Sequence, residues 1–193
     1  MKIEKEYFED EKFEGLKLAS KKLISKQFMN CAFQGCDFME TNFSSASFEE
    51  CVFRSCNFSL TVLKSARLQG AEFIDCKFIG VDFSEVNKLL IKLSFADSIL
   101  ENCNFNSVKI PGTNFSNCKI RNCDFYKAEL SKCAFEGSDL EGSTFESSDL
   151  TGCDFSEAKS YNINPLVNKI KGARFSVPEV ISLLGVFEIE IDE

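Results

Sequence analysis

The sequence contains no histidine and no tryptophan, and only three of its 193 residues are proline. Without histidine, the chain cannot carry a Ser–His or Cys–His nucleophile pair, histidine acid–base catalysis or a mixed Cys/His zinc site. No Cys-x-x-Cys motif occurs, so the spacing of tight metal-ligand pairs and dithiol redox sites is missing as well. We therefore predict a protein that is not an enzyme and that has no cofactor and no bound metal.

Long apolar runs are also missing. The longest aliphatic run, Leu89-Leu90-Ile91, is far shorter than the roughly 20 residues that a membrane-spanning helix needs. The N-terminus reads MKIEKEYFEDEKFEG and lacks the apolar core of a secretory signal. We expect no membrane association and a cytoplasmic location, where cysteine thiols stay reduced.

Positive charge is in the minority. The chain has 22 Lys and Arg against 30 Asp and Glu, for a formal net charge of -8. A protein that binds nucleic acid directly needs a basic footprint to neutralise phosphates. The sequence therefore predicts no direct nucleic-acid binding.

Phenylalanine is abundant and strictly spaced. Of the 21 Phe, all except Phe187 fall at what we call the centre position of a five-residue repeat. The repeat runs without a miss from Phe8 to Phe83, slips by two residues, and resumes at Phe95. A period of five matches neither an α-helix nor a single long strand. Leu or Ile occupies most of the centre positions that Phe does not, and in the second half the two kinds alternate.

The ten cysteines obey the same period. Every one lies two residues before a centre, at what we call the small position, which Ser, Thr, Ala and Val share elsewhere. Buried thiols act as small apolar side chains, and we prefer this interpretation to a metal or redox role. The cysteines are Cys31, Cys36, Cys51, Cys56, Cys76, Cys103, Cys118, Cys123, Cys133 and Cys153.

With Asp or Asn often just before the centre, as in Cys36-Asp37-Phe38 and Cys123-Asp124-Phe125, this pattern resembles the A-(D/N)-(L/F)-x-x repeat of the pentapeptide-repeat family. The resemblance covers residues from about 30 to 175. It implies an all-β fold, a right-handed quadrilateral β-helix with four repeats per coil. At twenty residues per coil, the chain would form about eight coils.

The repeat predicts five segments. Residues 1–27 are expected to form an N-terminal capping coil, because large or charged residues occupy its small positions. The first β-helix segment would cover 28–83, the frame slip 84–94, the second segment 95–176, and a C-terminal helix and acidic tail 177–193. The unsuited residues in the first segment are Glu6, Glu11, Leu16, Lys21 and Lys26.

The slip at 84–94 allows two structures. A bulge near Glu85–Asn87 would return Leu90 to the repeat and give a packed bend between two rods. The alternative is a projecting loop. The segment is rich in Leu and Ile, which favours the packed bend.

A short helix is predicted near residues 177–184. Ser176 and Glu179 have the spacing of a capping box, with Pro178 in the first turn. The apolar residues exceed what one capping face needs, so we predict either a homodimer contact or complete packing on the last coil. Residues 186–191 alternate apolar and acidic, which is compatible with a short terminal strand. The predicted dimer contact consists of Val180, Leu183, Leu184, Val186 and Phe187.

Residues 133–158 contain acids but no Lys or Arg. Some pentapeptide-repeat proteins, the Qnr-type quinolone-resistance proteins, are dimeric rods that are implied to mimic DNA on gyrase. The resemblance therefore implies a non-catalytic acidic rod whose partner is DNA gyrase or topoisomerase IV; the alternative is an interaction scaffold with a different partner. The predicted partner-binding acids are Glu136, Asp139, Glu141, Glu146, Asp149, Asp154 and Glu157.

Overall fold

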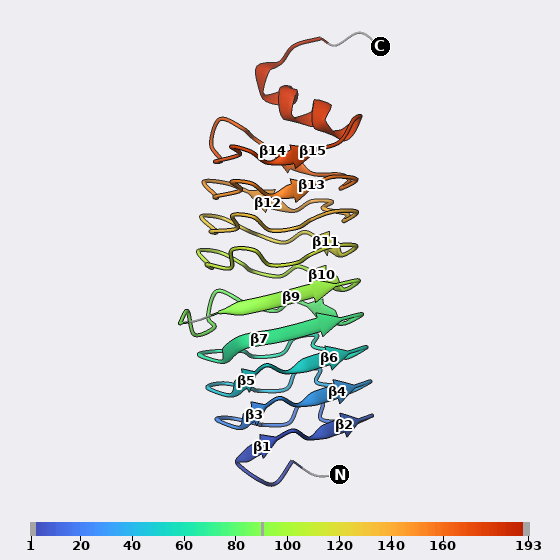
Figure 1. Cartoon of the computed structure of the whole chain (residues 1–193), viewed down its shortest axis with the longest axis vertical. Coiled ribbons are helices and arrows are strands. Elements are labelled where there is room, and N and C mark those ends of the chain that lie inside the picture. Colours follow the sequence, from blue (N-terminus) through green and yellow to red (C-terminus); the bar gives the residue numbers. More distant parts are fainter. Residues whose placement is uncertain (1–2, 90, 191–193) are drawn as a thin grey trace.

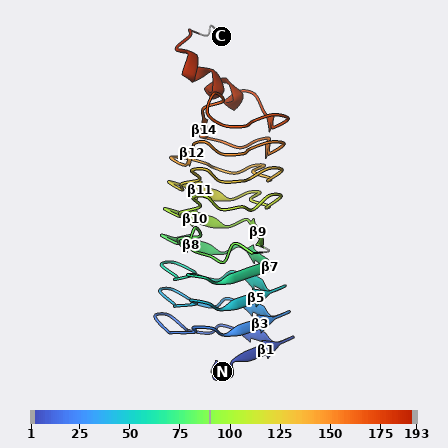
Figure 2. The same cartoon turned by 90° about the vertical axis from the view of Figure 1, so that its left-hand side faces the viewer.

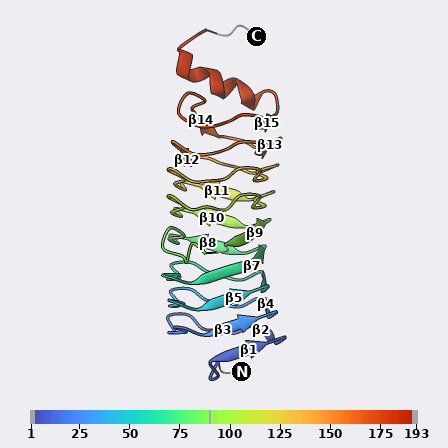
Figure 3. The same ribbon diagram turned by 60° about the vertical axis from the view of Figure 1, so that its left-hand side comes forward.

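The computed structural model describes residues 3–89 and 91–190. The chain winds into a parallel β-solenoid of about eight coils, with one helix across its C-terminal end (Figure 1). The two termini lie at opposite ends of the rod, as the turned views also show (Figures 2 and 3). The predicted right-handed quadrilateral β-helix is thus confirmed.

The regular elements are short because each side of the square coil holds only one repeat. Most strands have two or three residues, and one longer strand, β7, turns a corner without interruption. The elements are β1 (Tyr7–Glu9), β2 (Lys12–Glu14), β3 (Gln27–Met29), β4 (Ala32–Gln34), β5 (Ser47–Glu49), β6 (Val52–Arg54), β7 (Arg67–Ile74), β8 (Lys77–Ile79), β9 (Lys92–Ala96), β10 (Ile99–Glu101), β11 (Lys119–Arg121), β12 (Thr144–Phe145), β13 (Asp154–Phe155), β14 (Asn162–Ile163), β15 (Arg174–Phe175) and the 3₁₀ helix η1 (Glu179–Phe187).

Neighbouring coils are in register at a step of twenty residues. Phe8 of β1 lies beside Phe28 of β3, and Phe28 lies beside Phe48 of β5, all in parallel pairing. The residue two after most centres has a positive φ, for example 58° at Ser25 and Ser45. This left-handed conformation turns the chain at the corner, and it explains why Gly, Ser, Asn and Asp are frequent there.

The centre residues form continuous aromatic ladders inside the rod. Phe115 stacks on Phe95 and Phe135, with ring centroids 5.3 and 5.0 Å apart. Its edge meets Phe105 and Phe125 at 6.0 and 6.2 Å. Offset stacks and edge contacts are the arrangements that aromatic quadrupoles favour. The core is therefore a column of rings rather than a layer between two sheets.

The small positions lie between the rings and form hydrogen bonds to the coil before. Cys51 Sγ donates to Phe28 O at 3.4 Å, and Thr61 Oγ1 donates to Phe38 O at 2.9 Å. Ser138 Oγ makes the same bond to Phe115 O at 2.6 Å. Cys, Ser and Thr are thus interchangeable here because each is small and each carries a donor.

Residues 7–26 form a complete first coil. β1 and β2 pair with β3 and β4, and Leu16 and Leu23 are buried. Glu6 and Lys21, at small positions, are exposed. The first coil has a neighbouring coil on one side only, so charged side chains at its small positions can reach solvent.

The frame slip adds two residues to one coil. Phe73 pairs with Phe95, an offset of 22, while the strands β7 and β9 keep the stack continuous. Val86 and Leu93 are buried, but Leu89 is 74% exposed on a short loop that projects from the rod (Figure 1). The predicted return of Leu90 to the repeat lies outside the described residues.

The C-terminal end departs from the predicted details. The helix is a 3₁₀ helix that begins at Glu179, and the predicted capping box does not form. Ser176 Oγ instead accepts a hydrogen bond from the Glu157 N–H at 3.2 Å. The hydroxyl therefore accepts no hydrogen bond from the first turn of η1. Residues 188–190 belong to no strand. Within the described residues, no helix has the length and apolar character needed to cross a membrane.

Candidate interaction surface

The square coil gives the rod four outer faces, each made by residues twenty apart. We call one of them the β2–β15 face: it contains β2, β4, β6, the second half of β7, β9, β13 and β15, with the corner residue that follows each. Isolated pairs Ser94–Asn114 and Asn114–Ala134 continue it between β9 and β13. Residues that are distant in the sequence therefore become neighbours along one face.

The seven predicted partner-binding acids do not share a face. Glu136, Asp154 and Glu157 belong to the β2–β15 face, since Ala134 pairs with Asp154. Asp139 and Glu141 lie on a second face, where Asp139 pairs with Lys119 in one neighbouring coil and Lys159 in the other. Asp149 lies on a third face, between its pairing partners Glu129 and Lys169. Glu146 lies beyond Thr144, on the fourth face. Acids that are close in the sequence are thus distributed around the rod.

Basic residues in neighbouring coils also pair with four of these acids. Arg121 pairs with Asp139 and lies 3.5 Å from Glu141. Lys169 Nζ lies 3.8 Å from Asp149, and Arg174 lies 3.0 Å from Asp154. In the described part of the chain, Glu136, Glu146 and Glu157 have no such ion pair. The local negative charge is consequently lower than the sequence of 133–158 indicates.

The β2–β15 face collects acids that the linear sequence keeps apart. Reading the sequence in steps of twenty, with one step of 22 across the frame slip, would have revealed this set, because each step equals one coil. Lys12, Arg54 and Arg174 are the basic residues on this face, and Arg174 is already paired with Asp154. The acids of the face are Glu14, Glu72, Asp75, Asp97, Glu136, Asp154 and Glu157.

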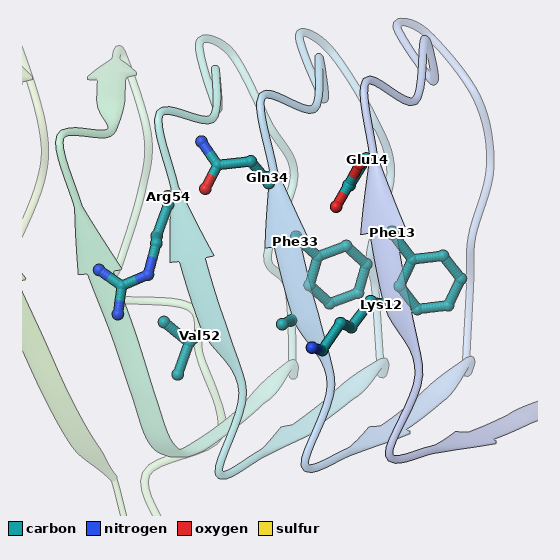
Figure 4. A pocket seen from close by; sticks show the side chains of 8 residues that line it. Lys12, Phe13, Glu14, Phe33, Gln34, Val52 and Arg54 are labelled. Carbon is teal, nitrogen blue, oxygen red and sulfur yellow. The ribbon is translucent and has the colours of Figure 1, made fainter.

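A shallow hollow of about 190 Å³ lies at the N-terminal part of this face. Figure 4 shows Lys12 and Val52 along one edge and Glu14 and Gln34 along the other, over the stacked rings of Phe13 and Phe33. The hollow exists because short side chains separate longer ones. Its lining carries both charge signs, with Lys12 and Arg54 beside Glu14.

The cysteine thiols are poorly suited to chemistry at this surface. All ten are free and buried. Burial raises the pKa of Cys51 and Cys118 to about 12, and a thiol must ionise to act as a nucleophile or metal ligand. Hydrogen bonds with the Cys56 and Cys123 thiols lower the pKa of Cys76 and Cys103, but these two thiols are equally buried. In the described residues, no group of three or more His, Cys, Asp and Glu side chains is arranged to hold a metal ion.

The predicted dimer-contact residues are divided between the interior and the surface. Leu183 is buried against the last coil, and Val180 packs partly against the core. Val186 is half-buried, whereas Leu184 and Phe187 are 40% and 50% exposed. The tighter turn of a 3₁₀ helix changes which residues share a side, so the faces expected for an α-helix do not apply.

Comparison with known proteins places these features in context. The sequence model of the Pentapeptide repeat region matches residues 26–89 and 87–155. Full-length QnrB1, a plasmid-mediated fluoroquinolone resistance protein, is similar in structure with a TM-score of 0.74 and 17% identity, over 95% of this chain and 100% of that chain. A trypsin-treated QnrB1 variant gives a TM-score of 0.67 at 19% identity, over 96% and 97%. A search of curated proteins finds no match.

Proposed function

This chain belongs to the pentapeptide-repeat family, and from that premise we propose that it is a non-catalytic rod that binds DNA gyrase or topoisomerase IV in the cytoplasm. The enzymes of this class bind DNA through basic surfaces, and an acidic rod can compete for such a surface. The likeness of the fold to QnrB1 over nearly the full length of both chains supports the comparison.

The observation that carries the proposal is the acidic β2–β15 face. At about 4.8 Å per coil, about eight coils make a rod roughly 38 Å long. One strand of duplex DNA presents about 11 phosphates over that length. The seven acids of this face, less its three basic residues, leave a net charge of -4, which is about a third of the charge of a single strand and far short of a duplex. We therefore propose that the rod presents this flank, rather than its whole circumference, to the enzyme.

A scaffold with a different partner is the second candidate, favoured by an apolar corner on another part of the rod. Met39, Leu60 and Val62 lie on adjoining coils and are 38%, 52% and 41% exposed. A DNA mimic has no use for exposed apolar side chains, while protein-binding surfaces often contain them. If this corner is the main contact, a pull-down would enrich a protein other than a topoisomerase, and Leu60→Glu would abolish its capture.

The predicted homodimer is a separate hypothesis, in which the exposed side of η1, with Leu184 and Phe187, would contact a second copy of the chain. Exposed apolar side chains at the end of a rod are removed from water when two copies meet. Loss of residues 177–193 should then lower the mass measured by light scattering, while the circular dichroism spectrum keeps its β-helix signal.

The decisive experiment for the first candidate is a gyrase supercoiling assay with and without a quinolone. The purified protein should inhibit supercoiling or relieve quinolone inhibition, and the double variant Glu72→Lys/Asp97→Lys should lose this effect. Glu85→Lys/Glu146→Lys makes the same change in net charge on another face and should retain it. If the wild-type protein has neither effect over a wide titration, the topoisomerase proposal is wrong.

A further inference from the structure

At the N-terminal end of the solenoid, the described residues leave part of the first coil's backbone without a neighbouring coil. In the second coil, Asp37 donates its N–H to Leu16 O at 2.8 Å and accepts from the Leu18 N–H at 2.9 Å. Asn42 makes the same two bonds, to Lys21 O and from the Leu23 N–H, both at 2.8 Å. Each residue just before a centre thus directs both backbone groups toward the coil beneath it.

Lys17 and Lys22 hold these positions in the first coil, pairing upward with Asp37 and Asn42. Within the described residues, no coil lies beneath them, and their N–H and C=O groups have no hydrogen-bond partner. Lys17 and Lys22 are single bridge residues on adjoining sides of the coil, and unpaired backbone groups at the edge of such pairing are a site where a further strand can add.

A hollow of about 430 Å³ lies at this edge. Leu18, Leu23 and Ile3 form its apolar part, and Lys17, Lys21 and Lys22 supply positive charge around it. Glu4 also lines the hollow. In the part of the chain that the structure describes, these three lysines form no ion pair, whereas Lys26 nearby is paired with Glu6 at 2.9 Å.

The apolar hollow and the surrounding lysines determine which side chains an added strand would need. An extended strand directs alternate side chains to opposite sides, so apolar residues could enter the hollow while their neighbours face the lysines. The lysines repel a second basic edge, which opposes head-to-head pairing of two N-terminal ends. The site therefore suits a strand in which apolar and acidic residues alternate.

The chain carries such a strand at its other end. Residues 187–193 read FEIEIDE. In an extended conformation Ile189 and Ile191 lie on one side, with Glu188, Glu190 and Asp192 on the other. Phe187 and Ile189 are 50% and 55% exposed, and residues 188–190 pair with no strand.

This tail cannot reach the first coil of its own molecule. The six residues after Phe187 span at most about 20 Å when extended, and the rod is roughly 38 Å long. We propose that the tail, residues 188–193, adds as a strand to the N-terminal edge of a second copy. Rods then associate head to tail, a heterologous contact that does not close and that allows chains of rods to grow.

This contact does not depend on the partner proposed above, and it differs from a symmetric dimer in which two η1 helices meet. Two variants separate these arrangements. The head variant carries Lys17→Glu, Lys21→Glu and Lys22→Glu, and the tail variant ends at Phe187. Sedimentation velocity would measure the mass of each alone and of an equal mixture, with circular dichroism to show that both remain folded.

For the wild type, we expect the average mass to rise with concentration and to fall between 50 and 500 mM salt, because screening weakens the charge contacts. Each variant alone should be monomeric, since one of its two ends is disabled. The mixture should form a two-chain complex and grow no further, because the tail of one variant meets the head of the other. A mixture that stays monomeric, or a head variant that associates like the wild type, would overturn the proposal; the latter result would favour the symmetric dimer.

A labelled peptide of residues 187–193 provides a second measurement. It should bind the tail variant, and addition of the three head substitutions should weaken its binding at least tenfold. The matched control is the same peptide with Lys in place of Glu188, Glu190 and Asp192, which should not bind. Binding that is equal for both peptides, or unaffected by the head substitutions, would show that the lysine-lined edge is not the site.

Discussion

Cys123 donates its backbone N–H to Ser143 Oγ in the next coil at 3.1 Å, and Ser143 Oγ donates in turn to Ile120 O at 2.7 Å. Cys123 Sγ makes the corresponding bond to Leu100 O at 3.4 Å. The small positions therefore form a hydrogen-bonded connection from coil to coil, next to the rings. A side chain there must be short enough to fit, and it benefits from a donor.

Cys123→Ser should change the unfolding free energy by less than about 1 kcal/mol, because it keeps both size and donor. Cys123→Ala loses the donor and should cost about 1 kcal/mol. Cys123→Arg buries an unpaired charge and should prevent folding. Urea denaturation followed by circular dichroism gives the order; an equal loss in all three variants would contradict a packing role.

Phe115→Ala should be among the most damaging single changes. Phe115 is fully buried and stacked on both sides, so its loss should cost about 3–5 kcal/mol. Phe175 is only partly buried, stacks on Phe155 and meets Tyr161 at a tilted 5.6 Å, and Phe175→Ala should cost about half as much. Thermal denaturation of the two variants compares them directly, and equal shifts would show that position in the ladder does not matter.

Leu60→Asn should stabilise the protein by about 0.5–1 kcal/mol, since Leu60 has a φ of 58° that disfavours most side chains and that Asn tolerates better. Gly80 occupies the next corner with a φ of 64°, and a Cβ there would lie 3.0 Å from Leu60 Cδ2. Gly80→Ala should therefore destabilise. Melting temperatures provide the measurement, and a lower value for Leu60→Asn would count against corner strain.

Asp149 should contribute to stability in a pH-dependent manner. Hydrogen bonds from the Thr151 hydroxyl and N–H, with the positive charge of Lys169, hold the pKa of Asp149 below its usual value. Because the folded-state pKa is depressed, the contribution is complete above the unfolded-state pKa of about 3.9 and disappears as pH falls through the folded-state pKa. The difference in urea midpoint between wild type and Asp149→Asn should thus be largest at neutral pH and vanish in strong acid. A difference that grows below pH 4 would reverse the sign and refute the assignment.

The centre and small positions could be predicted because their physical requirement is local and periodic. Phe115 and Cys123 are in the core as their spacing indicates. The frame slip could be located from Phe83 and Phe95, but not its shape. Its form depends on how β9, which follows the two extra residues, pairs with β7 through a shift of register between Gln69 and Ala71, which no local pattern encodes.

The candidate surface was harder to predict, because sequence neighbours turn onto different faces. Glu136 and Glu146 are close in the sequence yet lie on different sides of the rod, while Asp154 and Arg174 are twenty apart and form an ion pair. The helix was misjudged for a similar reason. Ser176 and Glu179 have capping spacing, but the hydroxyl is used by the Glu157 N–H of the preceding coil.

The step of 22 residues at Phe73–Phe95 and the step of 18 at Phe145–Ile163 differ from the usual twenty. In a stack of nearly equivalent coils, a folding chain could align one coil too early or too late and still place rings on rings. The two unequal steps make the possible alignments unequal, because a chain paired one coil out of register would place the longer and shorter coils against the wrong neighbours. The two irregular coils therefore favour one register of the stack over the out-of-register alternatives.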